Sequence, residues 1–376
     1  MKVLQISKFY WPVMGGIESV AWELSEGLNR AGVQADVLCS NQRRQTTREK
    51  FSTGYDVVRT ASHGMLLSTS MSPAMVRQLC RLAPAYDVLH VHMPDPMAAL
   101  AVWVARPRGA VVVHWHSDVI RQRKALKLYE PLQRWLLQRA NAVVATSEAY
   151  SAASDSLRAW RSRVEVVPIG ISDRYSAKVS EQAAALRQRF RKRRIVFSLG
   201  RMTYYKGFDV LIEAAAALPD DCVVLIGGDG ELLEHYRSMV IKRGLAGKVH
   251  LLGHIAHLDL PSYYEACDVF CMPSTVRAEA YGVAMVEAMV MGKPIVATDI
   301  AGSGVPWVNV HGVTGYNVPV RQPALLAAAL LQLLCDQPLR QSMGAASRQR
   351  YLQEFNAELM TQRTIDLYRR LMPASR

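Results

Sequence analysis

The sequence lacks any hydrophobic run that could cross a membrane as a helix. Its longest apolar stretches, residues 98–105 and 283–291, fall well short of the ~20 residues that a membrane helix needs. The first residues, MKVLQISKFYW, turn polar too early for a secretory signal peptide. These features predict a protein of the cytoplasm.

Cysteine is scarce, and several diagnostic motifs are missing. The six cysteines show no dense framework, so we expect reduced thiols, most of them small core residues. No G-x-G-x-x-G follows the first strand-like run, and the glycines from Gly227 onward lack the third at the right spacing. This argues against a nicotinamide dehydrogenase. No Asp-x-Asp motif is present, which argues against the metal-dependent sugar transferases that need one.

Positive charge, in contrast, is in excess, with a formal net charge of +13. No nucleic-acid-binding motif accompanies it, so anionic lipids and anionic small substrates are the better partners. Residues 119–139 hold six Lys or Arg against Glu130 and repeat apolar residues at helical spacing. Such a helix could rest on an anionic membrane through Arg121, Arg123, Lys124 and Lys127, or pack on its own domain as a solvated helix.

Short buried strand-like runs alternate with helical patterns along nearly the whole chain. The first series covers residues 3–7, 35–40, 87–92, 110–116, 142–147 and 164–170. A basic segment, 187–194, precedes a second series at 195–200, 222–228, 249–253, 269–274 and 294–299. This pattern predicts an α/β fold with two doubly wound, Rossmann-like domains, joined near residues 172–194. Ligands of such sheets bind at the carboxyl ends of the strands, here in an interdomain cleft.

Two loops at predicted strand ends carry groups suited to anions. Gly15 and Gly16 precede a helix expected at 17–31, whose free N–H groups could face an anion. Arg201 and Lys206 follow the strand that ends at Gly200, and two such cations suit a diphosphate. Taken alone, each pattern fits a plain solvated loop equally well.

The strongest pattern is the pair Glu279 and Glu287, eight residues apart at the start of a helix expected over 282–291. The amides of Tyr281, Gly282 and Val283 would be free donors at its amino end. A carboxylate beside a diphosphate needs hydroxyl donors, which sugars and ribose supply. One glutamate can therefore recognise the transferred sugar and the other the ribose.

Histidines occur in two alternating pairs, His90/His92 and His114/His116. Each pair would share one face of its strand. Four zinc ligands from one sheet would require converging loops, and no Cys or acidic residue stands at metal spacing. We therefore expect no metal, so that Arg201, Lys206 and helix amino ends must meet the charge of a leaving diphosphate.

Together the GGIE, GRMTYYKG and Glu279–Glu287 motifs resemble retaining glycosyltransferases of the GT-B fold, family 4, over nearly the whole chain. The resemblance implies that Glu279 contacts donor-sugar hydroxyls, Glu287 the ribose, and Arg201 with Lys206 the pyrophosphate. It implies that the loop at Ile255 meets the nucleobase and that His116 is the catalytic position. It also implies an acceptor-binding domain (1–175), a donor-binding domain (176–355) and a last helix (356–376) crossing back to the first domain.

Two segments are similar to a bacterial subgroup of mannosyl- and rhamnosyltransferases. One is WHSDVIRQRKALKLY, and the other is SGVPWVNVHGVTGYNV, in which Trp307 stands where relatives usually have glutamate. This implies a GDP-sugar as co-substrate, with no other cofactor. The implied acceptor is a lipid-linked glycan of a cell-surface polysaccharide such as O-antigen, at the inner face of the cytoplasmic membrane. The alternatives are a nucleotide-sugar epimerase of the same fold, a UDP-sugar-dependent transferase with another acceptor, and a non-catalytic sugar-binding relative.

Overall fold

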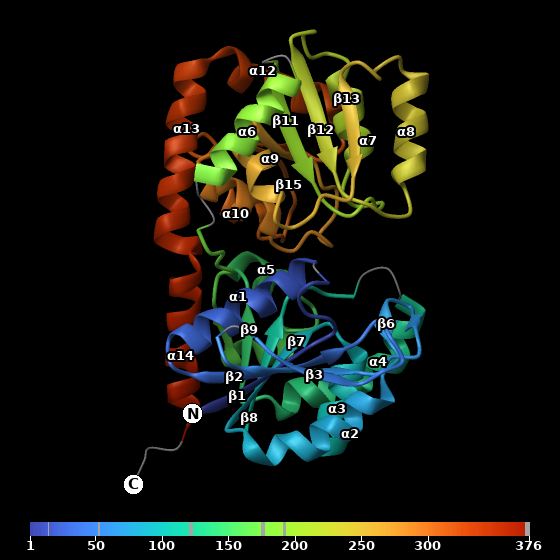
Figure 1. The fold of residues 1–376 in the computed structure, drawn as a ribbon, viewed down its shortest axis with the longest axis vertical. Coiled ribbons are helices and arrows are strands. Elements are labelled where there is room, and N and C mark those ends of the chain that lie inside the picture. The colour runs from blue at the N-terminus through green and yellow to red at the C-terminus, as the bar shows by residue number, and fades with distance from the viewer. Residues whose placement is uncertain (14, 52, 120–122, 174–176, 191–192, 373–376) are drawn as a thin grey trace. The chain divides into compact units, whose positions relative to one another are not determined.

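The computed structural model describes residues 1–13, 15–51, 53–119, 123–173, 177–190 and 193–372, except for the side chains of residues 123–126 and 177. The chain forms two compact units (Figure 1). Unit 1 comprises Met1–Ser172 and Asn356–Arg376, and unit 2 comprises Asp173–Phe355. Each unit is an α/β domain built on its own, largely parallel sheet.

Unit 1 contains an eight-stranded sheet in the order β10-β9-β8-β7-β1-β2-β4-β3, in which only β3 and β4 pair antiparallel. Its strands are β1 (Lys2–Ser7), β2 (Gln34–Ser40), β3 (Thr47–Lys50), β4 (Asp56–Thr60), β7 (Val88–Met93), β8 (Ala110–Trp115), β9 (Ala142–Ala145) and β10 (Val164–Val166). A small hairpin, β5 (Met65–Leu66) and β6 (Thr69–Ser70), stands apart from this sheet. Its helices are α1 (Gly16–Arg30), α2 (Pro73–Leu82), α3 (Pro96–Ala105), α4 (Arg123–Arg139), α5 (Glu148–Ala153) and α14 (Ala357–Leu371).

Unit 2 contains a six-stranded parallel sheet in the order β13-β12-β11-β14-β15-β16. Its strands are β11 (Arg194–Leu199), β12 (Cys222–Gly227), β13 (Val249–Gly253), β14 (Val269–Met272), β15 (Ile295–Asp299) and β16 (Gly315–Pro319). Its helices are α6 (Ala177–Arg189), α7 (Phe208–Ala215), α8 (Leu233–Lys242), α9 (Leu260–Ala266), α10 (Val283–Val290), α11 (Val305–Val308), α12 (Pro323–Cys335) and α13 (Gln337–Arg350).

The central strands of both sheets are buried on both faces, which explains their continuous apolar runs. The two predicted Rossmann-like sheets are confirmed. The predicted joint over residues 172–194 is too long, because α6 packs against α9 inside unit 2. The chain passes from unit 1 to unit 2 at Ser172–Asp173.

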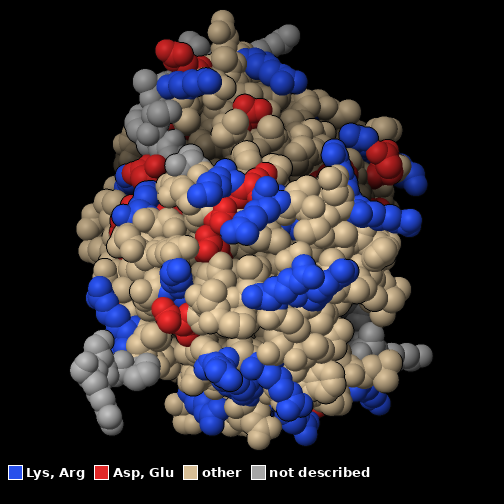
Figure 2. All heavy atoms as spheres, turned by 60° about the horizontal axis from the view of Figure 1, so that its bottom comes forward, with Lys and Arg blue, Asp and Glu red and all other residues tan. Residues whose placement is uncertain are grey.

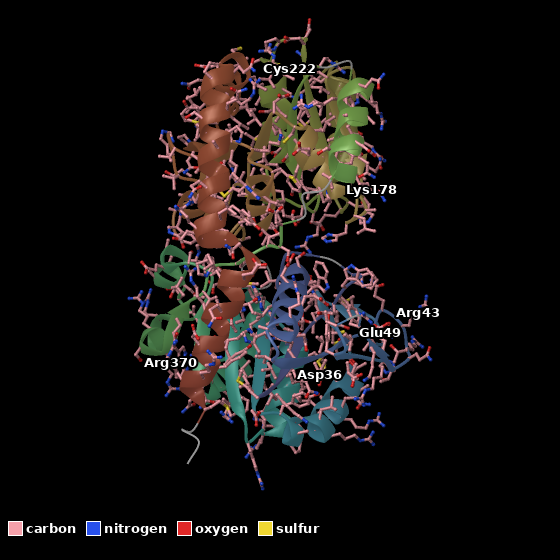
Figure 3. All side chains as sticks on the ribbon, turned by 60° about the vertical axis from the view of Figure 1, so that its left-hand side comes forward. Asp36, Arg43, Glu49, Lys178, Cys222 and Arg370 are labelled. Atoms are coloured by element: carbon pink, nitrogen blue, oxygen red, sulfur yellow. The ribbon has the colours of Figure 1, made fainter. Side chains whose placement is uncertain are left out.

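The last helix, α14, completes unit 1 by packing against α1. A side chain at Gly27 of α1 would place its Cβ only 2.1 Å from the Thr361 hydroxyl, so glycine is required for this approach. Asn356 caps α14 by accepting a hydrogen bond from the Leu359 amide. Near the other end of α14, Arg370, which is labelled in Figure 3, forms an ion pair with Glu165.

All six cysteines are free thiols, four of them buried and two exposed, which agrees with the predicted reduced state. Within the described residues, no helix combines the length and the apolar composition that spanning a bilayer demands.

Candidate donor and histidine sites

A buried ion pair lies at the carboxyl edge of the sheet in unit 2. The loops after β11 and β14, two neighbouring strands, bring Lys206 Nζ within 2.5 Å of Glu279 Oε2. Both side chains are nearly buried, with 13% and 10% of their surface exposed. The Ser274 hydroxyl donates a second hydrogen bond, of 2.9 Å, to the same carboxylate oxygen. Two residues predicted separately, 73 positions apart, therefore form one charged centre.

The local backbone and charges hold this centre in place. Burial alone would lower the pKa of Lys206, but the attraction of Glu279 raises it above its ordinary value, so the ammonium stays charged. The positive charge of the exposed Arg201 lowers the pKa of Lys206 in part, because two cations repel each other. Gly200 leaves room for the lysine, because a Cβ there would lie 3.0 Å from Lys206 Cε.

The loop that carries Glu279 is fixed by main-chain hydrogen bonds. The Ser303 hydroxyl donates to the Glu279 carbonyl at 2.5 Å, and the Gly304 amide donates to the Ala280 carbonyl at 2.8 Å. The Glu279 amide in turn donates to the Val276 carbonyl at 3.0 Å. A carboxylate held in this way is preorganised for a partner and loses little conformational entropy on binding.

Helix α10 begins beside this centre, as predicted. Gly282 precedes it with φ +88°, a left-handed conformation that glycine adopts without strain. Within the described residues, the amides of Gly282 and Val283 have no hydrogen-bond acceptor, so they are available to a ligand. Tyr281 is buried, with its ring 6.2 Å from that of Trp307. Glu287, half-buried along α10, accepts a 2.6 Å hydrogen bond from the Tyr264 hydroxyl.

The predicted nucleobase loop is also packed on this sheet edge. Ile255 is buried, and a Cβ at Gly227 would lie 2.5 Å from its Cδ1 atom. Gly228, with φ +128°, approaches the carbonyl of Gly200 so closely that a Cβ there would lie 1.9 Å from the oxygen. These glycines bring the ends of β11 and β12 together with the loop that follows β13.

The remaining predicted residues belong to unit 1. Gly15 precedes α1 in an extended conformation, and a Cβ there would lie 2.5 Å from Glu18 Oε2. Gly16 is the first residue of α1 and faces open space. His116 directly follows β8 and is buried, with 6% of its surface exposed.

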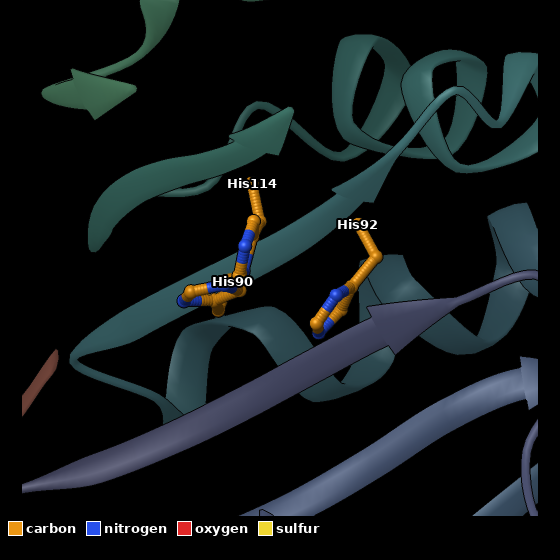
Figure 4. A group of neighbouring side chains, drawn as sticks. All are labelled: His90, His92 and His114. Atoms are coloured by element: carbon orange, nitrogen blue, oxygen red, sulfur yellow. Dashed lines mark hydrogen bonds between the residues drawn. The ribbon is translucent and has the colours of Figure 1, made fainter. Parts of the chain in front are cut away.

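The two histidine pairs come together, which corrects the expectation that four such residues need converging loops. Strands β7 and β8 are neighbours, and their register places His92 opposite His114 (Figure 4). His90 Nε2 lies 3.1 Å from His114 Nδ1, and His92 Nδ1 lies 2.9 Å from His116 Nε2. The rings of His114 and His116 stack, with centroids 4.1 Å apart.

Two further residues complete this cluster, and the sequence reasoning missed both. The Gln5 Oε1 atom lies 2.9 Å from His92 Nε2, and the Tyr368 hydroxyl lies 2.6 Å from His90 Nδ1. Gln5 Nε2 donates to the Tyr368 hydroxyl at 3.3 Å. A polar Gln5 inside the buried strand β1 is an anomaly that could have signalled the cluster.

Three of these rings could approach one metal ion only with rearrangement. One nitrogen from each of His90, His92 and His114 lies within 4.8 Å of the others. Nitrogens that share a tetrahedral zinc ion lie about 3.3 Å apart, given bonds of about 2.0–2.1 Å. The hydrogen bonds between the rings and to Gln5 and Tyr368 also occupy most of these nitrogens.

The predicted basic helix forms as α4, and its apolar side packs inside unit 1. Leu136 and Leu137 are buried, whereas Lys127 and Leu128 are exposed. Arg121 lies outside the described residues, as do the side chains of Arg123 and Lys124. Figure 2 shows a face of the protein on which Lys and Arg side chains are more prominent than Asp and Glu.

Family models match both units of the chain. The model described as glycosyltransferase family 4 matches residues 14–175, and the model described as glycosyl transferases group 1 matches residues 181–350. The fold is similar to Anabaena HepE solved with UDP-glucose, at TM-score 0.80 and 21% identity over 98% of this chain and all of that one. It is also similar to a sucrose-phosphate synthase from Thermosynechococcus elongatus, at TM-score 0.81 and 22% identity over the full length of both chains.

Relatives of higher identity cover nearly the whole chain. The O-antigen chain mannosyltransferase C of Escherichia coli is 30% identical over 99% of both chains. The D-rhamnosyltransferase WbpZ of Pseudomonas aeruginosa is 33% identical over 95% of this chain and 93% of its own. The chain therefore belongs to the GT-B glycosyltransferases with family 4 and group 1 domains. It is a hexosyltransferase, as the sequence predicts.

Proposed function

We propose that the chain is a retaining transferase that moves mannose or rhamnose from a GDP-sugar to a lipid-linked glycan of a cell-surface polysaccharide. The donor assignment draws on the mannosyl- and rhamnosyltransferase names of the two relatives and on the sequence resemblance. The observation that carries the proposed chemistry is the Lys206–Glu279 pair, with free amides at the start of α10. It places a buried cation, a carboxylate and N–H donors at one sheet edge.

Each of these groups has a role toward a nucleotide sugar. Arg201 and Lys206 neutralise the donor diphosphate, and the amides of Gly282 and Val283 donate to its oxygens or to sugar hydroxyls. Glu279 accepts hydrogen bonds from hydroxyls of the transferred sugar. Because the carboxylate already binds Lys206, it couples recognition of the sugar to the group that holds the leaving phosphate. In this proposal no metal ion or further cofactor takes part.

Glu287 and Ile255 take the roles that the resemblance implies. Tyr281, Gly15 and Gly16 take the roles that their places at helix amino ends predict. Glu287 binds the ribose, and its contact with the Tyr264 hydroxyl orients the carboxylate for that purpose. Ile255 lies against the nucleobase, and Tyr281 contributes its backbone to the donor site. Gly15 and Gly16 allow the start of α1 to approach the donor.

In the proposed reaction, an acceptor hydroxyl attacks the anomeric carbon from the face that the diphosphate leaves. The new glycosidic bond forms as the bond from carbon to phosphate oxygen breaks, and that oxygen takes the proton of the hydroxyl. Lys206 and Arg201 meet the negative charge that develops on the diphosphate. His116, from unit 1, steadies the positive charge that develops on the sugar. The configuration at the anomeric carbon is retained.

Calorimetric titration of the protein with GDP, UDP, ADP and NAD, with and without chelator, tests the donor class. We expect GDP to bind at least about tenfold more tightly than the others, a difference of about 1.4 kcal/mol, with no effect of chelator. Binding of NAD alone, or loss of nucleotide binding in chelator, would contradict the proposal. Tightest binding of UDP would favour the UDP-sugar alternative. Isomerisation of the donor without an acceptor would favour an epimerase.

We also propose that α4 brings unit 1 to an anionic membrane surface, where a lipid-linked acceptor resides. The exposed Lys127 and Leu128 and the net charge of +13 support this. A relative named phosphatidyl-myo-inositol mannosyltransferase, from Mycobacterium leprae, is 27% identical over 93% of both chains.

Co-sedimentation with vesicles tests the membrane proposal. The protein should bind vesicles containing anionic phosphatidylglycerol and not vesicles of phosphatidylcholine alone. Changing Arg121, Arg123, Lys124 and Lys127 to Glu should abolish this binding, since each basic residue near the surface contributes about 1 kcal/mol. Equal sedimentation of this variant and the wild type would contradict the role of α4.

A further inference from the structure

The hydrogen bonds around His116 form one continuous chain that ends at His114. In order, its members are His116, His92, Gln5, Tyr368, His90 and His114, and we call them the histidine chain. Every member is buried and belongs to unit 1. Strands β1, β7 and β8, which are consecutive in the sheet, supply Gln5, the pair His90 and His92, and His114; His116 directly follows β8, and α14 supplies Tyr368.

Each imidazole of the histidine chain is neutral and therefore carries a single N–H. Burial lowers the pKa of His114 to about 3. Burial and the neighbouring rings hold the pKa values of His90, His92 and His116 well below the ordinary histidine value. Burial also raises the pKa of Tyr368, so its hydroxyl keeps its proton. With one proton per ring, the donor in each contact determines the donor in the next.

The orientation of the Gln5 amide determines which atoms donate in the hydrogen bonds between Gln5, His92 and His116. Gln5 Nε2 donates to the Tyr368 hydroxyl, which leaves Oε1 as the acceptor facing His92. His92 must then carry its proton on Nε2, so its Nδ1 is the acceptor in the contact with His116. His116 therefore carries its proton on Nε2, and its Nδ1 holds an unprotonated lone pair. Among the described residues, that Nδ1 has no hydrogen-bond partner.

The hydrogen bonds that lead from Gln5 through Tyr368 and His90 to His114 determine which nitrogen of His114 carries its proton. Because the Tyr368 hydroxyl accepts from Gln5, we infer that its own proton is donated to His90 Nδ1, 2.6 Å away. His90 then donates from Nε2 to His114 Nδ1. The remaining proton lies on His114 Nε2, the one histidine nitrogen of this cluster that is buried with no partner in the described structure.

We propose that Gln5 and Tyr368 are positioning residues that hold His116 in the Nε2–H tautomer, so that Nδ1 accepts a hydrogen bond from a hydroxyl of the sugar substrate. This inference rests on the proposed function for the identity of that hydroxyl. The opposite tautomer requires the Gln5 amide to rotate and every proton of the histidine chain to shift. It would make Nδ1 a donor, which cannot accept from a hydroxyl.

The tautomer can be measured without any activity, by NMR of protein with ¹⁵N-labelled histidine. Wild-type His116, assigned with His116→Gln, should show a protonated Nε2 and an unprotonated Nδ1. Tyr368→Phe removes the acceptor of Gln5, and Gln5→Leu removes the acceptor of His92. Both should produce a second His116 tautomer. Tyr10→Phe is the matched control, because it also removes a buried tyrosine hydroxyl of unit 1, one that bonds to Tyr55 and not to a member of the histidine chain.

Kinetic readouts separate this role from general damage to the fold. Tyr368→Phe and Gln5→Leu should lower kcat about 10- to 100-fold, the effect of losing one positioned hydrogen bond, and leave the nucleotide Kd unchanged within about twofold. Tyr10→Phe should change neither. A protonated Nδ1 in wild-type His116, or an unaltered tautomer in both variants, would overturn the proposal. So would one equivalent of zinc in the purified protein that is lost in His90→Gln. If the wild type transfers no sugar, the proposed function fails while the NMR result still decides the tautomer.

Discussion

Replacing Glu279 by glutamine is expected to lower kcat by about 10²- to 10³-fold, the range for removing one preorganised electrostatic group. Glutamine keeps the shape of the side chain and an oxygen for the Ser274 hydroxyl. It removes the negative charge, which pairs with Lys206 and which makes hydrogen bonds from sugar hydroxyls stronger. The nucleoside diphosphate should bind at least as tightly as before, because the variant removes an anion beside the diphosphate.

Initial rates and calorimetry with GDP measure the two effects separately. Glu234→Gln is the matched control, since Glu234 forms an exposed ion pair with Arg237 in the same unit. Surface pairs of this kind contribute little, so its kcat should stay near the wild-type value. A Glu279→Gln variant with wild-type kcat would show that the carboxylate does not act on the sugar.

Replacing Lys206 by methionine should have the complementary effect, a loss of nucleotide affinity of about 10- to 100-fold, as expected for a charged hydrogen bond of ~1.5–3 kcal/mol. Methionine fills much of the same space but supplies no charge. It also leaves Glu279 buried without its cation, so the thermal unfolding temperature must be measured alongside. Arg201→Met should weaken nucleotide binding in the same direction without this cost, because Arg201 is exposed.

Lys242→Met serves as the control for the lysine variant, because Lys242 lies in the exposed last turn of α8 in the same unit. Its nucleotide affinity should equal that of the wild type. If Lys206→Met and Arg201→Met both bound GDP with unchanged affinity, neither cation would hold the diphosphate. The assignment of this sheet edge to the donor would then be wrong.

The sequence was sufficient to predict the two sheets because their central strands are buried on both faces and read as continuous apolar runs. Strand β3, with the sequence TREK, was missed because it is a largely exposed edge strand without an apolar pattern. Strand β16 was missed because it begins with Gly315 and ends with Pro319, residues typical of loops.

The candidate donor residues were identified individually, but their pairing was not. Lys206 and Glu279 were assigned to different parts of the donor, and their contact depends on β11 and β14 being neighbours in the sheet. Strand order is a property of the whole fold that no local pattern encodes. The same reason explains the histidine chain, in which Tyr368 reaches His90 from 278 residues away.

In the proposed function, this chain transfers a hexose with retention from a GDP-sugar without a metal. The most direct test is NMR of the product formed from GDP-mannose or GDP-rhamnose and a lipid-linked glycan, in the presence of chelator. We expect transfer in which the new glycosidic bond has the same anomeric configuration as the donor. An inverted product, or transfer that stops in chelator and resumes with added metal, would contradict it.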